Sequence, residues 1–176
     1  NKGIEHSKGK FIARMDADDI SLPWRLETQV ECFNANDDLV LLGANVMQVD
    51  AAENVIDCTD LPLDDWTIRC MCLFINPFAH PSVMFRRHTL VSKNLAYNVT
   101  FETTQDWDLW TRLLEHGKAR NMKQPLVHQR MHQGSVSVKK KQVQVANSLR
   151  IQARYVKIFL AETAWNRASF SSINIG

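Results

Sequence analysis

The sequence predicts an α/β fold, a sheet flanked by helices, for this chain of 176 residues. Short apolar runs typical of strands alternate with longer segments whose apolar residues recur at helical spacing. The run at residues 10–15 ends in a cluster of carboxylates, and a proline suited to the first turn of a helix follows at Pro23. Ligands in open α/β sheets bind beyond the carboxyl ends of strands, so we expect a binding site at this cluster.

The first segments combine helix and strand patterns. Residues 1–10 read as the inside of a helix, and residues 10–15 as a buried strand. A second helix is expected from Pro23 to about residue 36, because Leu26, Val30 and Phe33 would share one apolar face. We therefore expect this helix to pack on the sheet through these three residues.

The middle of the chain predicts two further strands around a helix. Residues 40–49 are apolar and read as a strand, in which Gly43 indicates a bulge or a close backbone approach. After a polar connection, residues 61–74 read as a helix. Residues 82–85 form a short apolar run after the turn-like segment NPFAHP, and we expect a third strand there.

The last third predicts two helices separated by a strand. Thr103 or Thr104 opens a helix that places Trp107, Trp110 and Leu114 on one face, and Gly117 ends it. Residues 125–131 read as a strand, and residues 139–165 as a long helix. We expect the tail beyond it to be frayed.

Composition and charge narrow the class of protein. The chain is 45% hydrophobic and 23% charged, as is usual for one globular domain, and its net charge of +2 gives no indication of nucleic-acid binding. No apolar run approaches the roughly 20 residues of a membrane-spanning helix. The four cysteines form no CxxC pair, and we expect reduced thiols in a cytoplasmic protein.

The acidic cluster consists of Asp16, Asp18 and Asp19. Positions i and i+2 of a strand share a face, so Asp16 and Asp18 can converge where the strand ends. Like charges held this close repel unless a cation or a proton lies between them, and hard oxygen ligands suit Mg²⁺ or Mn²⁺ shared with substrate phosphates.

Other interpretations of the same motif stay open on the residues alone. An Asp-rich turn can simply cap the following helix. A calcium loop would span Asp16 to Glu27, but Ser21 stands where the sharp turn requires Gly, and Pro23 lies inside the loop. A phosphatase of the haloacid-dehalogenase type would use Asp16 as its nucleophile, yet Ile20 stands where that motif usually has Thr or Val.

Five segments in order carry a family resemblance: GKFIARMDADDISLPWRLETQ, LVLLGANV, NPFAHPSVMFRR, TTQDWDLWTRLLEHGK and VHQRMHQGSVS. Together they resemble the family 2 glycosyltransferases of the GT-A fold, inverting nucleotide-sugar enzymes of bacterial polysaccharide assembly. The resemblance implies a GT-A-like, Rossmann-like mixed sheet. It covers residues 1–137 and lacks the family's first βαβ region. We therefore expect the C-terminal part of a catalytic domain, incomplete at its N-terminus, followed by a C-terminal helix and tail in residues 138–176.

The resemblance implies a donor site. Asp16 and Asp18 match the family's D-x-D, whose carboxylates hold a divalent metal and the ribose and diphosphate of the donor, with Asp18 as the direct ligand. His132 matches a histidine that completes the metal site and favours Mn²⁺ over Mg²⁺. Arg130 would bind the diphosphate. A solvated strand end is the alternative for Arg130 and His132.

The resemblance also implies an acceptor side. Asp106 matches the general base that takes the proton of the acceptor hydroxyl, although Gln105 stands where the family usually has Glu. Asp108 is assigned to the helix dipole. His80 and Trp107 are expected on the acceptor side, with a structural turn and core packing as their alternatives.

The implied partners are a nucleotide-sugar donor, with a UDP-sugar favoured, and a saccharide or lipid-linked acceptor. The basic helix after Lys139 has two interpretations, a packing helix and a peripheral contact with the inner face of the membrane. A truncated, non-catalytic remnant or binding module is the alternative to an enzyme, and hydrolysis by a phosphatase-like site is a second one.

Overall fold

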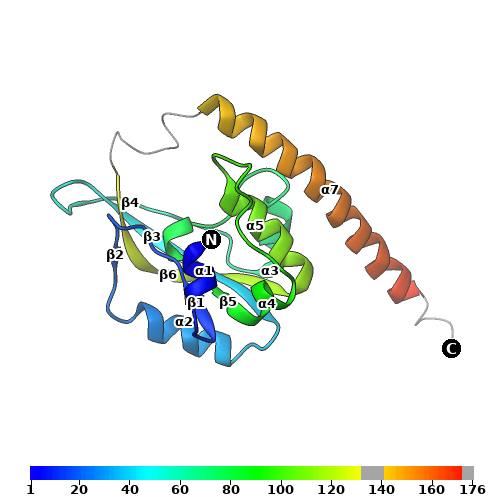
Figure 1. Cartoon of the computed structure of the whole chain (residues 1–176), viewed down its shortest axis with the longest axis horizontal. Helices are drawn as coiled ribbons and strands as arrows, with labels where there is room; N and C mark the ends of the chain where they lie inside the picture. Colours follow the sequence, from blue (N-terminus) through cyan, green and yellow to red (C-terminus); the bar gives the residue numbers. More distant parts are fainter. Residues whose placement is uncertain (132–140, 172–176) are drawn as a thin grey trace.

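The computed structural model of the chain describes residues 1–131 and 141–171. Its centre is a mixed sheet in the order β1-β5-β3-β6-β2, with β4 paired to the C-terminal end of β3 (Figure 1). Strands β3 and β6 run parallel, and the other described pairs are antiparallel. The strands are β1 (Phe11–Ala13), β2 (Ile20–Ser21), β3 (Leu39–Val49), β4 (Val55–Cys58), β5 (Met84–Arg86) and β6 (Lys118–Arg130).

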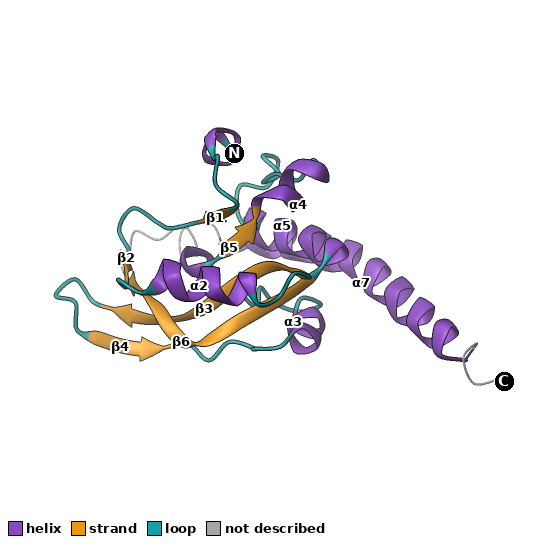
Figure 2. Cartoon of the chain, turned by 90° about the horizontal axis from the view of Figure 1, so that it is seen from below, coloured by secondary structure: helices purple, strands orange, loops and turns teal. Residues whose placement is uncertain are grey.

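Helices cover both faces of this sheet. Helix α2 lies on one side, and α5 and α7 lie on the other (Figures 1 and 2). The described helices are α1 (Lys2–His6), α2 (Arg25–Asn34), α3 (Asp65–Met71), α4 (Arg87–Ser92), α5 (Gln105–Leu113) and α7 (Lys141–Ser171), with short 3₁₀ turns η1 (His80–Ser82) and η2 (Leu114–His116). The arrangement confirms the expected mixed sheet flanked by helices with a C-terminal helix.

Two apolar clusters form because successive strand residues point to opposite faces. In β3, Leu41 belongs to the larger cluster under α5 and α7, whereas Leu42 belongs to the smaller one under α2. In β5, Phe85 and Met84 divide in the same way. Both faces of these central strands are therefore buried, which explains why they read as continuous apolar runs.

Several expected elements have different bounds. Strand β1 ends at Ala13, so Asp16 and Asp18 lie in the loop and turn beyond it rather than on the strand. Helix α3 is shorter than expected and β6 is longer. The short elements β2, β4 and α4 were not predicted. The four residues of β4 are all exposed, so β4 has no buried face that a pattern could reveal.

The expected packing face of α2 is confirmed at Phe33 and Val30, which belong to or pack against the smaller cluster, and was wrong at Leu26. Leu26 is 54% exposed, and the buried positions are Arg25, Gln29 and Phe33. Arg25 donates from Nη2 to the backbone oxygen of Arg14 at 2.7 Å and from Nε to Gln29 Oε1 at 3.1 Å. Burial lowers the pKa of Arg25 to about 10, so the side chain remains a cation at neutral pH. Hydrogen bonds from the cationic side chain of Arg25 therefore join α2 to the residue that follows β1, beside the apolar contact of Phe33.

Gly43 marks a close backbone approach, as expected. A Cβ added there would lie 2.2 Å from Oδ1 of Asn121 and 2.7 Å from the ring of Phe78. Because the position has no side chain, Asn121 lies against β3 and donates from Nδ2 to the backbone oxygens of Pro62 at 2.8 Å and Pro77 at 3.0 Å. Gly43 therefore makes room for the amide that holds the segments before and after α3.

Helix α7 packs on the domain through one face. Ile151 and Tyr155 are fully buried in the larger cluster, and Asn147 donates to the backbone oxygen of Thr103 at 3.2 Å. These contacts support the packing interpretation of this helix. Within residues 1–131 and 141–171, no helix combines the length and apolar character needed to cross a bilayer. Lys139, Lys140 and the last five residues lie outside the described part.

Candidate active site

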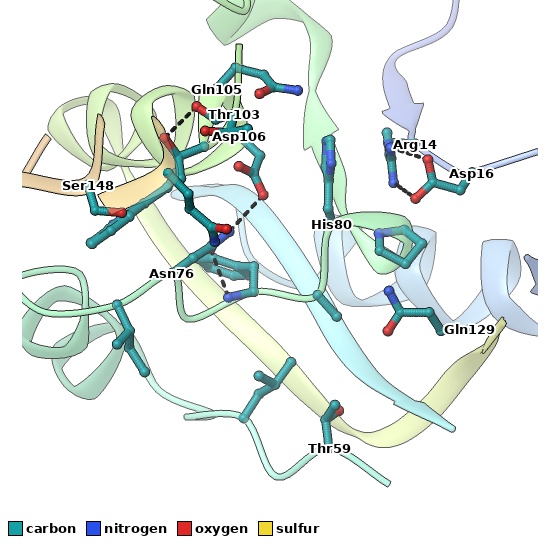
Figure 3. Close-up of a pocket in the computed structure, with 18 of the residues that line it drawn as sticks. Arg14, Asp16, Thr59, Asn76, His80, Thr103, Gln105, Asp106, Gln129 and Ser148 are labelled. Atoms are coloured by element: carbon teal, nitrogen blue, oxygen red, sulfur yellow. Dashed lines mark hydrogen bonds and ion pairs between the residues drawn. The ribbon is translucent and has the colours of Figure 1, made fainter. Parts of the chain in front are cut away.

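A cavity of about 900 Å³ opens beside the ends of the central strands (Figure 3). Segments far apart in the sequence build its wall. They are the turn after β1, the loop after α3, the start of α5, the end of β6 and the start of α7. The residues that line the cavity include Arg14, Asp16, Asp18, Phe74, Ile75, Asn76, His80, Thr104, Gln105, Asp106, Trp107, Gln129, Gln144 and Ser148.

The acidic turn forms one side of the cavity. Asp16 and Asp18 both line it, and the two guanidinium nitrogens of Arg14 bind the two carboxylate oxygens of Asp16 (Figure 3). Asp19 does not line it: Oδ1 accepts from the backbone N–H of Arg130 at 2.9 Å, which joins the turn to β6. The turn is thus held at Asp16 by Arg14 and at Asp19 by the end of β6.

The donor set of this turn fits a divalent cation shared with a substrate. Asp16 and Asp18 supply hard oxygen atoms, and Oδ2 of Asp19 is buried without a hydrogen-bond partner among the described residues. Burial raises the pKa of Asp19, and the charges of Asp16 and Asp18 raise it further. No three His, Cys, Asp or Glu side chains of residues 1–131 and 141–171 come together as a metal cluster. Two carboxylates are what Mg²⁺ or Mn²⁺ uses when phosphates complete its coordination.

Asp106 lies on another side of the cavity, in the first turn of α5. Asn76 donates from Nδ2 to Oδ2 of Asp106 at 2.7 Å (Figure 3). Burial raises the pKa of Asp106, whereas hydrogen bonds from the backbone and from Asn76 lower it. Thr104, the N-cap residue of α5 two positions before Asp106, has φ 62°, an unusual conformation for a β-branched residue. Backbone strain of this kind tends to occur at functional sites.

His80 lies between the acidic turn and Asp106 in the view of Figure 3. Its Nε2 is 3.0 Å from the hydroxyl of Tyr97. Burial lowers the pKa of His80 to about 3, so the imidazole is neutral at physiological pH and can only exchange neutral hydrogen bonds with a ligand.

Trp107 lines the cavity but is almost entirely buried. It is 3% exposed and packs in the larger cluster, as does Trp110, which is fully buried. Core packing therefore accounts for both indoles, and neither presents an open ring face to a sugar in this structure. The exposed apolar residues of the cavity wall are instead Phe74 and Ile75, at 69% and 49%.

One residue expected at the donor site, Arg130, does not line the cavity in this structure. The guanidinium of Arg130 binds Oε1 of Glu53 at 2.5 Å, and Arg130 is not part of the cavity wall. His132 lies outside the described residues. The cavity wall that the structure describes has one Lys or Arg side chain, that of Arg14, which the sequence analysis did not consider. Because side chains two residues apart in an extended segment share a face, the spacing of Arg14 and Asp16 could have predicted their contact.

Asn76, Gln144 and Ser148 were also missed. Asn76 belongs to the quoted NPFAHP turn, but nothing in the sequence connects it to Asp106, 30 positions away. Gln144 and Ser148 share a face of α7 at the spacing of one helical turn, and only the docking of α7 brings them to the cavity.

Comparison with known proteins identifies a family. Residues 1–94 match the profile described as "Glycosyl transferase family 2". The chain is 29% identical over 170 residues to "Amylovoran biosynthesis glycosyltransferase AmsE" of Erwinia amylovora, covering 96% of this chain and 62% of that protein. It is 32% identical over 138 residues to "O-antigen biosynthesis glycosyltransferase WbnJ" of Escherichia coli, covering 77% and 53%. The chain thus spans somewhat more than half the length of these relatives.

Solved structures share the fold at low sequence identity. TarS of S. aureus in complex with UDP-GlcNAc superimposes with a TM-score of 0.60 at 10% identity, covering 87% of this chain and 49% of that one. TarS in complex with UDP gives a TM-score of 0.56 at 11% identity, covering 89% and 48%. At this identity the likeness establishes the fold alone.

Proposed function

Because this chain belongs to glycosyl transferase family 2, we propose that it moves a sugar from a nucleotide-diphosphate donor to an acceptor hydroxyl, with inversion at the anomeric carbon, in the assembly of a surface polysaccharide. The observation that carries the proposal is that one cavity holds both the acidic turn and Asp106. Inversion requires attack from the face opposite the leaving diphosphate, so a base placed apart from the acidic turn suits the reaction.

The donor side is assigned to the acidic turn and Arg14. Asp18, with Asp16, would hold Mn²⁺ or Mg²⁺, and a bound cation would neutralise charge that develops on the leaving diphosphate. Arg14 carries the positive charge of the described wall. Its guanidinium group would bind phosphate oxygens in the bidentate geometry with which it binds Asp16. Arg130 and His132 remain predicted donor ligands. The complexes of TarS with UDP and UDP-GlcNAc favour a UDP-sugar as the first donor to test.

The acceptor side is assigned to Asp106. Its carboxylate takes the proton of the acceptor hydroxyl while that oxygen forms the bond to the anomeric carbon, and the electron pair of the breaking bond leaves with the diphosphate. The exposed side chains of Phe74 and Ile75 offer an apolar surface for the ring of a saccharide acceptor. Neutral His80 lies between the two sides and suits a hydroxyl of either sugar.

We place the reaction on the cytoplasmic side, where a lipid-linked acceptor would meet it at the inner face of the membrane. Helix α7 supports a peripheral contact, because Val145, Leu149 and Leu160 are exposed on it at 54%, 61% and 60%. A phosphatase-like reaction is less well supported, because the chain belongs to a glycosyltransferase family and Ile20 stands where the phosphatase motif usually has Thr or Val.

Calorimetric titration of the 176-residue chain with UDP, with and without Mn²⁺, tests the donor site. Binding should require Mn²⁺, disappear in Asp18→Asn, and persist in Asp37→Asn, an exposed carboxylate away from the cavity wall. Release of UDP from UDP-GlcNAc in the presence of saccharide acceptors then tests transfer. Equal UDP binding by the wild type and Asp18→Asn would overturn the assignment of the acidic turn, and Mn²⁺-dependent binding without any transfer would favour the binding-module alternative.

A further inference from the structure

The side-chain amide of Asn76 has a defined orientation beside Asp106. Its Oδ1 accepts from the backbone N–H of Phe78 at 3.2 Å, and its Nδ2 donates to Oδ2 of Asp106 at 2.7 Å (Figure 3). A backbone N–H can only donate, so it requires the oxygen end of the amide. The amino end must therefore face Asp106, and the contact is a hydrogen bond to a carboxylate.

The segment that carries Asn76 is anchored independently of Asp106. On one side, the buried amide of Asn121 donates to the backbone oxygen of Pro77 at 3.0 Å. On the other, Gln152 of α7 donates from Nε2 to the backbone oxygen of Phe74 at 2.8 Å. Since β6 and α7 both hold this loop, Asn76 is a fixed donor to which the Asp106 side chain adjusts.

We propose that Asn76 is a positioning residue for the proposed base: it holds Oδ2 of Asp106 and directs the remaining lone pairs of that carboxylate toward the acceptor hydroxyl. The inference depends on the role proposed above for Asp106, but the hydrogen bond itself does not. A donor at this place has a second effect. It stabilises the ionised carboxylate, which burial alone would disfavour, and so keeps Asp106 able to accept a proton.

The chain contains a matched control for this pair. Asn54 donates from Nδ2 to Oδ2 of Asp50 at 3.1 Å, an equivalent amide–carboxylate contact on an exposed turn away from the cavity wall. The Asn54 side chain lowers the pKa of Asp50, as Asn76 does for Asp106. Each substitution should therefore affect only its own carboxylate, so that each Asn–Asp pair serves as the control for the other.

The experiment is a pH titration of the chain with ¹³C-labelled aspartate carboxyl groups, followed by NMR. Asn76→Ala should shift the titration of Asp106 to higher pH and leave Asp50 unchanged, whereas Asn54→Ala should do the reverse. Asn76→Asp retains an oxygen for the Phe78 N–H but places a second carboxylate beside Asp106, so it should raise the pKa of Asp106 further. An unchanged Asp50 titration also reports that the two Asn76 variants are folded, and an unchanged Asp106 titration reports the same for Asn54→Ala.

An Asp106 titration that is the same in the wild type, Asn76→Ala and Asn76→Asp would overturn the inference. This readout uses no donor or acceptor, so its failure is distinct from a failure of the proposed glycosyl transfer. Where transfer is observed, Asn76→Ala should lower kcat by about tenfold to a hundredfold with the KM for the donor nearly unchanged, as expected for a misplaced base. A kcat equal to that of the wild type would count against Asn76 as a positioning residue.

Discussion

Arg154 in α7 and Asp108 in α5 form an ion pair, with 2.6 Å between Nη1 and Oδ1, at a carboxylate that has no exposure to solvent. Arg112 binds the other oxygen, Oδ2, at 2.6 Å. Asp108 was expected only to favour the dipole of its helix. The carboxylate instead joins α7 to α5, whose first turn carries the proposed base. Contacts of α7 therefore help to fix the position of the site.

Asp108→Asn should strongly destabilise the fold, because two guanidinium groups would lose their anionic partner at a buried position. Because the side chains of Arg112 and Arg154 are themselves 22% and 38% exposed, the loss of their charge-assisted hydrogen bonds to Asp108 should cost about 1.5–3 kcal/mol. Urea unfolding at neutral pH measures the change, and Asp38→Asn, which removes an exposed ion pair with Lys118, is the matched control. We expect little change in the control. A similarly small effect in Asp108→Asn would show that the buried pair contributes no net stability.

Asp106→Asn should abolish transfer and at the same time stabilise the fold at neutral pH. Burial raises the pKa of Asp106 above its unfolded value, so the folded state binds more protons than the unfolded state between these two values. The free energy of unfolding therefore falls as pH rises through that window, and Asn removes this penalty. The gain over the wild type should be present at pH 7 and vanish below pH 4.

Thermal unfolding of both proteins across this pH range measures the effect. Asp50→Asn should behave in the opposite sense, because hydrogen bonds from Asn54 and the backbone lower the pKa of Asp50. Its loss should therefore reduce stability at pH 7 and have no effect in acid. Asp106→Asn with normal transfer activity would remove Asp106 from the mechanism.

Gly43→Ala should destabilise the chain by about 1–3 kcal/mol, because the added methyl group would overlap Asn121 and Phe78. The same substitution at Gly3, where an added Cβ would meet nothing within 4 Å, should be neutral or slightly stabilising. The difference in urea midpoint between the two variants measures the loss of stability caused by a methyl group between β3 and the side chains of Asn121 and Phe78. Equal midpoints would show that Asn121 moves aside freely.

The sequence pattern predicted the sheet best where burial is on both faces. Leu39–Val49 reads as a strand because nearly every residue is buried, and α5 reads as a helix because Trp107, Trp110 and Leu114 share a face. The acidic turn and Asp106 were recognised through family motifs, and the cavity brings these segments together. Local pattern therefore sufficed for the central elements, and motif order indicated two segments that line the same cavity.

Contacts between distant segments were not predictable in this way. Arg25 and Gln29 are buried because they satisfy backbone oxygens of β1 and η1, and no periodicity in α2 shows such partners. Asn76 acquires its role only when folding places it beside Asp106, 30 positions away. The side chain of Arg130 was expected at the diphosphate, but a surface partner, Glu53, binds it in the structure.

The parallel pairing of β3 with β6 bears on how the chain folds during its synthesis. Leu39–Val49 is hydrogen-bonded on one side to a strand that begins only at Lys118. A ribosome adding about 5–20 residues per second therefore exposes this apolar segment for several seconds before its partner emerges. Such long-range pairing slows folding and leaves strand edges open to other chains. The nascent protein should therefore depend on chaperones most strongly in the interval between these two strands.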